Sequence, residues 1–349
     1  MTIASAATAF PKHHYRQEVL LSAFVKHWGP RLDNPKFLER LHARVGVDSR
    51  NLVLPMHEYV DLGPWGKANN HWIESAQELG QQSLCCALNR AGFAATDINA
   101  IFFVSVTGVA SPSIDARLVN RMKLSRHIKR VPIFGLGCVA GAAGLARAAD
   151  YVRAFPKHVA AVIAVEICSL TLQVDDLSIA NLISAGLFGD GAAAALVAGA
   201  ERECPGPRVL ATRSIFYPDT EQVMGWDISE KGFRIVLSRE VPEVVEGHLA
   251  GDVDAFLADE GMTRRDIGSW ILHTGGPRVL EATESALGLE PGALDASWAC
   301  LRKMGNLSSA SVLAVLEEVI QNRRPAAGTF SILAAMGPGF CSELILLRW

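Results

Sequence analysis

The sequence contains no apolar run long enough to cross a lipid bilayer, which takes about 20 residues in a helix. The apolar stretches 158–170 and 185–200 are interrupted by Glu166 and Asp190. Residues 1–17 also lack the positively charged head and continuous apolar core of a secretory signal peptide. We therefore expect no membrane span and a cytoplasmic location.

A strong net charge is absent as well. The 349 residues include 33 Lys and Arg against 36 Asp and Glu, so the net charge is −3, and both signs are mixed along the chain. Proteins that bind nucleic acid through charge carry an excess of basic residues, and acidic tails carry the opposite. Neither pattern occurs, so nucleic acid is not an expected partner. Half of the residues are hydrophobic, which is typical of a globular protein with a sizeable core.

The cysteine patterns of metal sites and disulfide frameworks are missing. The seven cysteines form no CxxC pair and no cluster with histidine at the spacing of zinc ligands. Their odd number in a long chain favours reduced thiols in a reducing compartment. We expect no metal and no other cofactor.

The sequence does contain short apolar segments that alternate with helical patterns. Buried strands are expected at 100–106, 130–136, 159–167 and 192–199, and again at 233–238, 269–276, 329–337 and 344–349. The clearest helical patterns lie between them, at 72–92, 113–122, 139–155, 243–261 and 308–324. This alternation predicts an α/β fold with a mostly parallel sheet that is covered on both faces. A polar segment rich in Gly and Pro at 199–208 suggests two halves, residues 1–200 and 201–349.

One cysteine stands at a junction between a strand and a helix. Cys138 follows the apolar segment 130–136 and precedes a helix whose first turns carry only small side chains. The free N–H groups and the dipole of a helix N-terminus lower the pKa of a thiol and can hold an oxyanion. A free cysteine is also often just a small buried hydrophobe, which is how we interpret Cys85, Cys86, Cys300 and Cys341. The junction makes Cys138 the best candidate nucleophile.

A nucleophile needs a base and groups that stabilise negative charge, and two residues in the second half are candidates. His273 ends an apolar strand and is followed by two glycines and a proline. Asn306 follows Gly305 and precedes a helix that starts near Ser308. Sites in α/β proteins form where strands end, although both residues could equally be structural caps.

Six segments resemble a known family in order and spacing. They are GCVAGAAGLARAADY, LFGDGAAAALV, GWDISEKGFRIVLS, HTGGPRVLEA, GNLSSASV and MGPGF, spread over nearly the whole chain. Together they are similar to the type III polyketide synthases, the chalcone synthase-like enzymes of the thiolase superfamily, in their bacterial form. The resemblance implies a thiolase-like α/β fold, in which two similar halves form a layered αβαβα core.

The resemblance also implies roles for the three candidates. Cys138 would carry the starter and the growing chain as thioesters. His273 and Asn306 would stabilise the thioester carbonyl during decarboxylation of a malonyl group, and His273 would keep Cys138 as a thiolate. Enolate formation needs hydrogen-bond donors placed where negative charge develops, and an imidazole and a carboxamide supply them.

Further positions follow from matching the same motifs. Two phenylalanines would act as gatekeepers between the coenzyme A tunnel and the site: Phe188 and Phe233. The elongation cavity would be lined by Val106, Thr107, Cys168, Thr171, Met224, Gly225 and Ser308. The basic helical segment 34–51 would meet the phosphates of coenzyme A through Arg40, Arg44 and Arg50, because guanidinium groups bind phosphate with paired donors.

The resulting hypothesis is an acyltransferase that condenses an acyl-CoA starter with malonyl-CoA. From the bacterial resemblance we expect a fatty acyl starter, a pyrone or resorcinol product, and a homodimer. Ketoacyl-acyl-carrier-protein synthase III shares the three residue types but would carry an HQAN-like motif where this chain has HTGGP. HMG-CoA synthase would need a glutamate upstream of its cysteine, and thiolase a second active-site cysteine. A papain-like cysteine hydrolase and a non-catalytic thiolase-fold partner are the alternatives from other classes.

Overall fold

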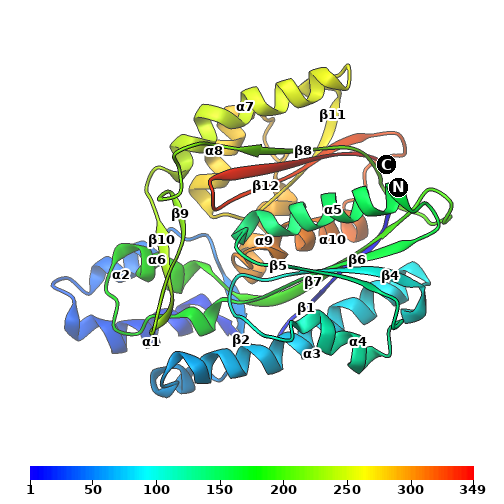
Figure 1. Cartoon of the computed structure of the whole chain (residues 1–349). Helices are drawn as coiled ribbons and strands as arrows, with labels where there is room; N and C mark the ends of the chain where they lie inside the picture. Colours follow the sequence, from blue (N-terminus) through cyan, green and yellow to red (C-terminus); the bar gives the residue numbers. More distant parts are fainter.

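The computed structural model describes residues 1–349 and contains one nine-stranded sheet with the strand order β11-β12-β13-β8-β1-β7-β6-β4-β5 (Figure 1). Its strands are β1 (Thr2–Ala9), β4 (Ile98–Val104), β5 (Lys129–Ile133), β6 (Val159–Ile167), β7 (Asp190–Ala198), β8 (Arg208–Phe216), β11 (Ile267–Leu272), β12 (Phe330–Gly337) and β13 (Cys341–Arg348). Strands β1 and β8 are joined in register only through Thr2 and Arg208. The sheet therefore divides there into two half-sheets.

The two half-sheets repeat the same pairing pattern. In the first, β4–β6 is parallel, while β6–β7 and β7–β1 are antiparallel. In the second, β11–β12 is parallel, while β12–β13 and β13–β8 are antiparallel. The expectation of two similar halves is confirmed, but that of a mostly parallel sheet is wrong. Residues 338–340 alone connect β12 to β13, which is too short for the crossover that a parallel pair needs.

Helices form the other layers of the molecule. Helices α5 (Ala140–Ala154) and α10 (Ala310–Asn322) lie between the half-sheets, and each contacts strands of both. Helices α3 (Trp65–Ala91) and α4 (Ile114–Met122) cover one outer face, and α7 (Val241–Asp259) and α8 (Pro277–Leu287) cover the other (Figure 1). This is the layered αβαβα arrangement that the resemblance implied.

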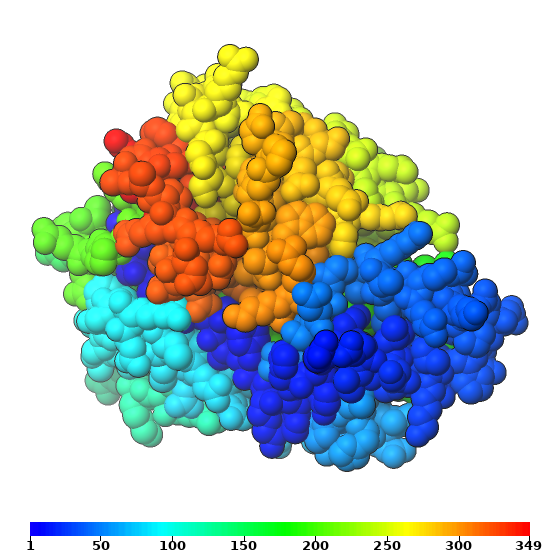
Figure 2. Space-filling view, turned by 180° about the vertical axis from the view of Figure 1, so that it is seen from behind, coloured from blue at the N-terminus to red at the C-terminus, as the bar shows by residue number.

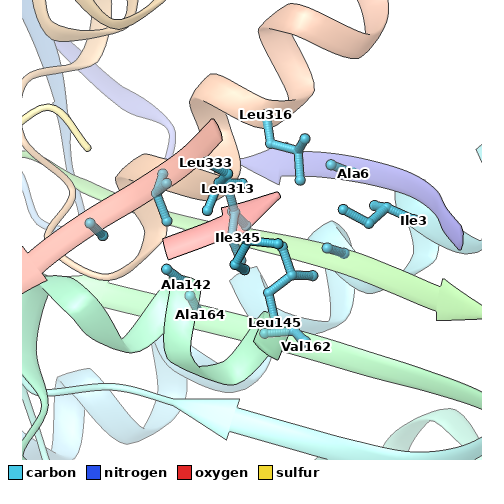
Figure 3. Close-up of a cluster of buried hydrophobic side chains, with 14 of the residues drawn as sticks. Ile3, Ala6, Ala142, Leu145, Val162, Ala164, Leu313, Leu316, Leu333 and Ile345 are labelled. Carbon is cyan, nitrogen blue, oxygen red and sulfur yellow. The ribbon is translucent and has the colours of Figure 1, made fainter. Parts of the chain in front are cut away.

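The largest hydrophobic cluster fills the space around the two central helices. Figure 3 shows Leu145 of α5 and Leu313 of α10 meeting side chains of both half-sheets, such as Val162 and Ile345. Gly141 has a specific reason to be glycine, because a Cβ there would lie 2.1 Å from the carbonyl oxygen of Ser309. The close approach of α5 to the start of α10 brings the segment of Cys138 next to the segment of Asn306.

A group of smaller elements lies beside the central layers. It contains α1 (Gln17–Trp28), α2 (Lys36–His42), α6 (Ile179–Leu187), α9 (Asp295–Met304), the two-stranded sheet β2–β3 (His13–Arg16, Ser49–Leu52) and the hairpin β9–β10 (Met224–Ser229, Gly232–Leu237). Figure 2 shows the N-terminal residues, in blue, against the orange C-terminal half, where β3 contacts α9. The N-terminal segment thus packs on both halves. No helix has the length and apolar character that crossing a membrane would require.

Two strands differ from expectation in an instructive way. Strand β5 was expected to be buried, but it is the exposed edge of the sheet. Its sequence KRVPI explains this, since charged residues and proline are typical of edge strands. Strand β1 was not expected at all, yet it lies in the middle of the sheet. Its small residues fit between two helix layers where large apolar side chains would not.

Candidate active site

One cavity of about 700 Å³ brings the candidate catalytic residues together. It is lined by side chains from both halves of the molecule, including Cys138, His273, Asn306 and Ser308. Cys138 lies in the 3₁₀ turn η4 (Gly137–Val139), which leads directly into α5. His273 follows β11, and Asn306 lies between α9 and α10. Three segments far apart in the sequence therefore meet at one site.

Cys138 is held at a tight junction. Gly137 before it has a φ of 54°, and a Cβ there would lie 2.5 Å from Pro338. The Cys138 Sγ lies 3.6 Å from the Ser308 Oγ, within hydrogen-bonding reach. Burial raises the pKa of Cys138 to about 12, although the Ser308 contact acts in the opposite direction. Burial thus outweighs the effect of the helix N-terminus on this thiol, so forming a thiolate at neutral pH needs a base.

His273 has the properties of such a base. Its backbone N–H donates to the Ala334 carbonyl at 3.1 Å, which extends the β11–β12 pairing by one residue. Burial lowers the pKa of the imidazole to about 4, so the ring is neutral near pH 7 and has a free nitrogen lone pair, although the lowered pKa also makes it a weaker base. Its Nδ1 is buried without a partner, whereas its Nε2 is not buried in this way. The Nε2 is thus the atom that faces the cavity.

The Asn306 side chain is oriented by its neighbours. Its Oδ1 accepts hydrogen bonds from the Ser308 N–H at 2.7 Å and from the Ser311 hydroxyl at 3.3 Å. Gly305, with a φ of 71°, allows this turn, because a Cβ there would lie 2.6 Å from the Leu187 carbonyl oxygen. With Oδ1 occupied, the Nδ2 donors are left for the cavity. The carboxamide is therefore arranged as a hydrogen-bond donor.

Comparison with known proteins identifies the family. Residues 64–201 match the N-terminal domain of chalcone and stilbene synthases, and residues 209–349 match the C-terminal domain. The chain is 48% identical over 351 aligned residues to 1,3,6,8-tetrahydroxynaphthalene synthase of Streptomyces peucetius subsp. caesius, covering 100% of this chain and 93% of that protein. This chain is a type III polyketide synthase of the chalcone and stilbene synthase family.

Two further comparisons agree with this assignment. The crystal structure of 1,3,6,8-tetrahydroxynaphthalene synthase from Streptomyces coelicolor A3(2), a bacterial type III polyketide synthase, superimposes with a TM-score of 0.96 at 32% identity, covering 100% of this chain and 99% of that one. The 3,5-dihydroxyphenylacetyl-CoA synthase of Streptomyces toyocaensis is 31% identical and covers 99% of this chain and 90% of its own length. The synthase is accordingly an acyltransferase. Its relatives differ in product, so membership alone does not fix the product.

Sequence reasoning missed the role of a buried carboxylate that lies behind the lining of the synthase site. Glu166 ends β6 and accepts hydrogen bonds from the backbone N–H of Val106 at 3.1 Å, the hydroxyl of Thr107 at 2.9 Å and the hydroxyl of Ser309. It ties the loop after β4 to the loop that carries Asn306. Burial raises the pKa of Glu166 from its ordinary value of 4.5 to about 7. A charged residue inside an apolar strand pattern was the available signal, since buried carboxylates are rare without partners.

We predict that Glu166→Gln destabilises the synthase by about 1–3 kcal/mol at pH 5, because the amide group leaves donors of this network without an acceptor. The difference in the free energy of unfolding between wild type and variant should shrink as the pH rises from about 4.5 to about 7. In this range unfolded wild-type chains release the proton and folded ones retain it, so wild-type stability falls while that of the variant does not. Urea unfolding at pH 5 and pH 8 measures both effects. A deficit that widens at pH 8 contradicts this role.

The predicted cavity residues divide into those that line the main cavity and those that do not. Val106, Met224, Gly225, Ser308 and Phe188, which was expected to be a gatekeeper, line it. Thr107 does not, because its hydroxyl is bonded to Glu166. Phe233, the other expected gatekeeper, does not line the main cavity either. It is 2% exposed and lines neither cavity of the site. Its ring packs among Trp65, Phe134 and Trp226 instead.

Cys168 and Thr171 line a second, smaller cavity of about 120 Å³. This second cavity lies among α1, the 3₁₀ helix η2 (Met56–Asp61) and α6, and its lining is mostly apolar. It shares three lining residues with the main cavity, namely Phe188, Trp226 and Ile235. The expectation that Cys168 and Thr171 border the main cavity is therefore wrong, although they adjoin it.

Of the three arginines predicted to bind coenzyme A, two line the main cavity and one does not. Arg40 and Arg44 line the main cavity and are exposed. Arg50 is only 2% exposed and donates to the Gln17 side chain and the Phe188 carbonyl, so it is not available to phosphates. Sequence reasoning missed Arg239 and Arg278, which line the main cavity from the start of α7 and α8. The cavity lining includes no Asp or Glu.

Among all residues, no group of three or more His, Cys, Asp or Glu side chains is arranged to hold a metal ion. The functional groups that the synthase presents to its main cavity are thus a thiol, an imidazole, a carboxamide, hydroxyls and guanidinium groups.

Proposed function

We propose that the synthase loads an acyl group onto Cys138 and extends it by decarboxylative condensation with malonyl-CoA, with His273 and Asn306 stabilising the negative charge. The observation that carries this proposal is the convergence of these three side chains from both halves on one cavity. A protonated thiol and a neutral imidazole that line the same cavity support loading by general base catalysis. The Cys138 sulfur attacks the thioester carbonyl, His273 takes the thiol proton, and the thiol of coenzyme A leaves with that proton.

Extension uses the same groups in a second role. The thioester carbonyl of malonyl-CoA would accept hydrogen bonds from the His273 Nε2 and the Asn306 Nδ2, which face the cavity. Loss of carbon dioxide leaves an enolate whose charge these donors stabilise. The enolate carbon then attacks the acyl group on Cys138, and the Cys138 thiolate leaves. The mostly apolar wall keeps water from competing with this carbon nucleophile.

For the product, we propose 1,3,6,8-tetrahydroxynaphthalene or a closely related fused ring. The support is the 48% identity, over the whole chain, to a protein named for that product. A naphthalene skeleton has ten carbons, which equals five two-carbon units. Five malonyl-CoA molecules that each lose carbon dioxide supply them, so malonyl-CoA would serve as starter and extender.

A second candidate is a fatty acyl starter that leads to a pyrone or resorcinol. The observation in its favour is the second cavity, whose apolar lining directly adjoins the main cavity at Phe188. An alkyl chain would be stabilised there by roughly 0.8 kcal/mol for each buried methylene group.

Product analysis separates the two candidates. The synthase is incubated with malonyl-CoA alone and, in parallel, with acyl-CoA starters from acetyl to dodecanoyl, and products are resolved by liquid chromatography and mass spectrometry. A naphthalene product from malonyl-CoA alone supports the first candidate, and alkylated products that follow the starter length support the second. A preparation that releases no carbon dioxide from malonyl-CoA contradicts the proposed function as a whole.

The four arginines of the main cavity support coenzyme A thioesters as substrates. None of Arg40, Arg44, Arg239 and Arg278 forms an ion pair, and no carboxylate lines the cavity beside them. Two of them lie close together in space, because Gly46, just after Arg44, packs against Pro277, just before Arg278. Guanidinium groups without partners at a cavity rim suit the phosphates of the nucleotide.

We predict that Arg278→Gln lowers kcat/KM for malonyl-CoA about tenfold, through KM, by removing one charge-assisted hydrogen bond. Activity with a malonyl thioester of N-acetylcysteamine, which lacks the nucleotide, should not change. Arg265→Gln is the matched control, since Arg265 is exposed and lines neither cavity. An equal loss with both substrates shows that Arg278 does not act on the phosphates.

We also propose that the synthase forms a homodimer through the free edge of β5. The outer edge of this strand has no partner in the chain, and Val131, Phe134 and the nearby Val109 are 37%, 50% and 40% exposed. Light scattering should give twice the chain mass of 37.5 kDa. The double variant Val131→Asp/Phe134→Asp should give the mass of one chain, and a dimer that persists in it excludes this edge as the interface.

A further inference from the structure

The hydroxyl of Ser308 is the side-chain group that lies within hydrogen-bonding reach of the Cys138 sulfur. Its Oγ is 3.6 Å from the Sγ, a separation that suits sulfur because sulfur is a larger atom than oxygen. Ser308 is 4% exposed and Cys138 is 7% exposed, so water competes little for this contact. The two residues come from different halves of the molecule, and the contact joins them across the main cavity.

The backbone of Ser308 is held in an unusual conformation. Its φ is 47°, in the left-handed region that destabilises residues other than glycine. Two hydrogen bonds hold it there: the Ser308 N–H donates to the Asn306 Oδ1 at 2.7 Å, and the Ser311 N–H donates to the Ser308 carbonyl at 3.1 Å. Glycine would adopt this conformation without strain, so a serine here indicates a use for its side chain.

The charged and titratable groups around the Cys138 sulfur do not stabilise a negative charge on it. Glu166 raises the pKa of Cys138, and Cys138 in turn raises the pKa of Cys168. The turn η4 also packs against β12, β13 and α5. Strand β12 carries no charged side chain, and Glu343 of β13 pairs with Arg147 of α5. A thiolate at this position therefore depends on neutral hydrogen-bond donors.

We propose that Ser308 is a catalytic residue of the synthase, whose hydroxyl donates a hydrogen bond to the Cys138 thiolate. This inference rests on the proposed function, in which that thiolate forms twice. In loading, the thiol proton passes to His273 and the sulfur attacks the acyl carbonyl. In extension, the new carbon–carbon bond forms, the bond between the acyl carbon and Cys138 breaks, and its electron pair stays on the sulfur. Ser308 keeps its own proton in both steps, and its hydrogen bond strengthens when the sulfur is charged.

The test measures the reaction of Cys138 with iodoacetamide at pH 7, followed by peptide mass spectrometry. Without the hydrogen bond, Ser308→Ala should hold about tenfold less thiolate. The remaining thiolate is about threefold more nucleophilic, because nucleophilicity rises with pKa, so alkylation should fall about threefold. Formation of acetyl-CoA from malonyl-CoA should not change, because the backbone N–H of residue 308 still donates to the Asn306 side chain.

A second variant separates the hydroxyl from the stability of the fold. Ser308→Gly also lacks the hydroxyl but fits the φ of 47°, so it should unfold at a higher urea concentration than Ser308→Ala. Both variants should show the same loss of alkylation. Ser83→Ala is the matched control, since Ser83 is a buried serine of α3 that donates to the Gly80 carbonyl and lines neither cavity. It should leave both rates unchanged.

Three results would overturn the role of Ser308. They are wild-type alkylation in both Ser308 variants, a loss of alkylation that follows stability rather than the hydroxyl, and a parallel loss of alkylation and acetyl-CoA formation. The last two would indicate a structural residue. A wild-type protein that releases no carbon dioxide from malonyl-CoA refutes the proposed function instead, so the two failures are distinguishable.

Discussion

Replacing Cys138 by alanine should abolish loading of any acyl group and, with it, all polyketide formation. The thiol is the sole nucleophilic sulfur that lines the main cavity, and its partner Ser308 is a far weaker nucleophile. Because no covalent intermediate forms, the loss should reach the detection limit rather than a partial reduction. Intact-protein mass spectrometry after incubation with acyl-CoA measures the loading directly.

The control for this variant is Cys86→Ala, which removes an exposed thiol on α3 away from the cavity. It should load as the wild type does. A Cys138→Ala protein that still gains the mass of an acyl group would place the nucleophile elsewhere. The neighbouring Cys168 would then be the first residue to examine, since it lies in the second cavity.

The second large effect concerns decarboxylation. His273→Ala and Asn306→Ala should each lower the rate of carbon dioxide release from malonyl-CoA by about 10²–10³, which is the usual cost of one donor at a developing oxyanion. Both donors face the cavity with their other polar atoms directed into the protein. The Cys138→Ala protein should retain decarboxylation, because the enolate forms before the sulfur is needed as an acyl carrier. Acetyl-CoA formed from malonyl-CoA is the measured product.

Control substitutions at a histidine and an asparagine outside the cavity test whether the loss of decarboxylation is specific to His273 and Asn306. His127 and Asn322 are exposed and remote from the cavity lining, so alanine at either position should leave decarboxylation unchanged. Full activity in His273→Ala or Asn306→Ala would remove that residue from the mechanism. The His273 variant should also show slower alkylation of Cys138 by iodoacetamide at pH 7, since burial raises the pKa of the thiol and the base would be gone.

The sequence was informative wherever chemistry depends on local context. Cys138 and Asn306 each follow a glycine, His273 is two residues before one, and all three lie where a strand or helix begins or ends, which is where the fold exposes side chains to a cavity. The longer helices and most strands could be predicted because their apolar periodicity reflects burial, whereas α1, α6, α8 and α9 were not predicted. Strand β1 was missed because its alanines carry no strong strand signal.

Other features depend on packing that the sequence does not display. Phe233 and Trp226 are close in sequence, similar in kind and on the same face of the hairpin, yet only Trp226 lines the cavities, because Phe233 is buried among Trp65, Phe134 and Trp226. Arg50 resembles Arg40 and Arg44 in type but is carried into the interior by β3. The rise in the pKa of Cys138 follows from burial in the folded molecule, which a local motif does not reveal.

The most direct test is a crystal structure of the Cys138→Ala synthase exposed to malonyl-CoA, in which acetyl-CoA, the product of the retained decarboxylation, occupies the main cavity. We predict that its thioester carbonyl oxygen lies within about 3.1 Å of both the His273 Nε2 and the Asn306 Nδ2, the distance of an oxyanion contact. The acetyl group should lie beside residue 138. A thioester carbonyl that neither side chain reaches, in a complex that still decarboxylates its substrate, would contradict the proposal that these groups act on one carbonyl.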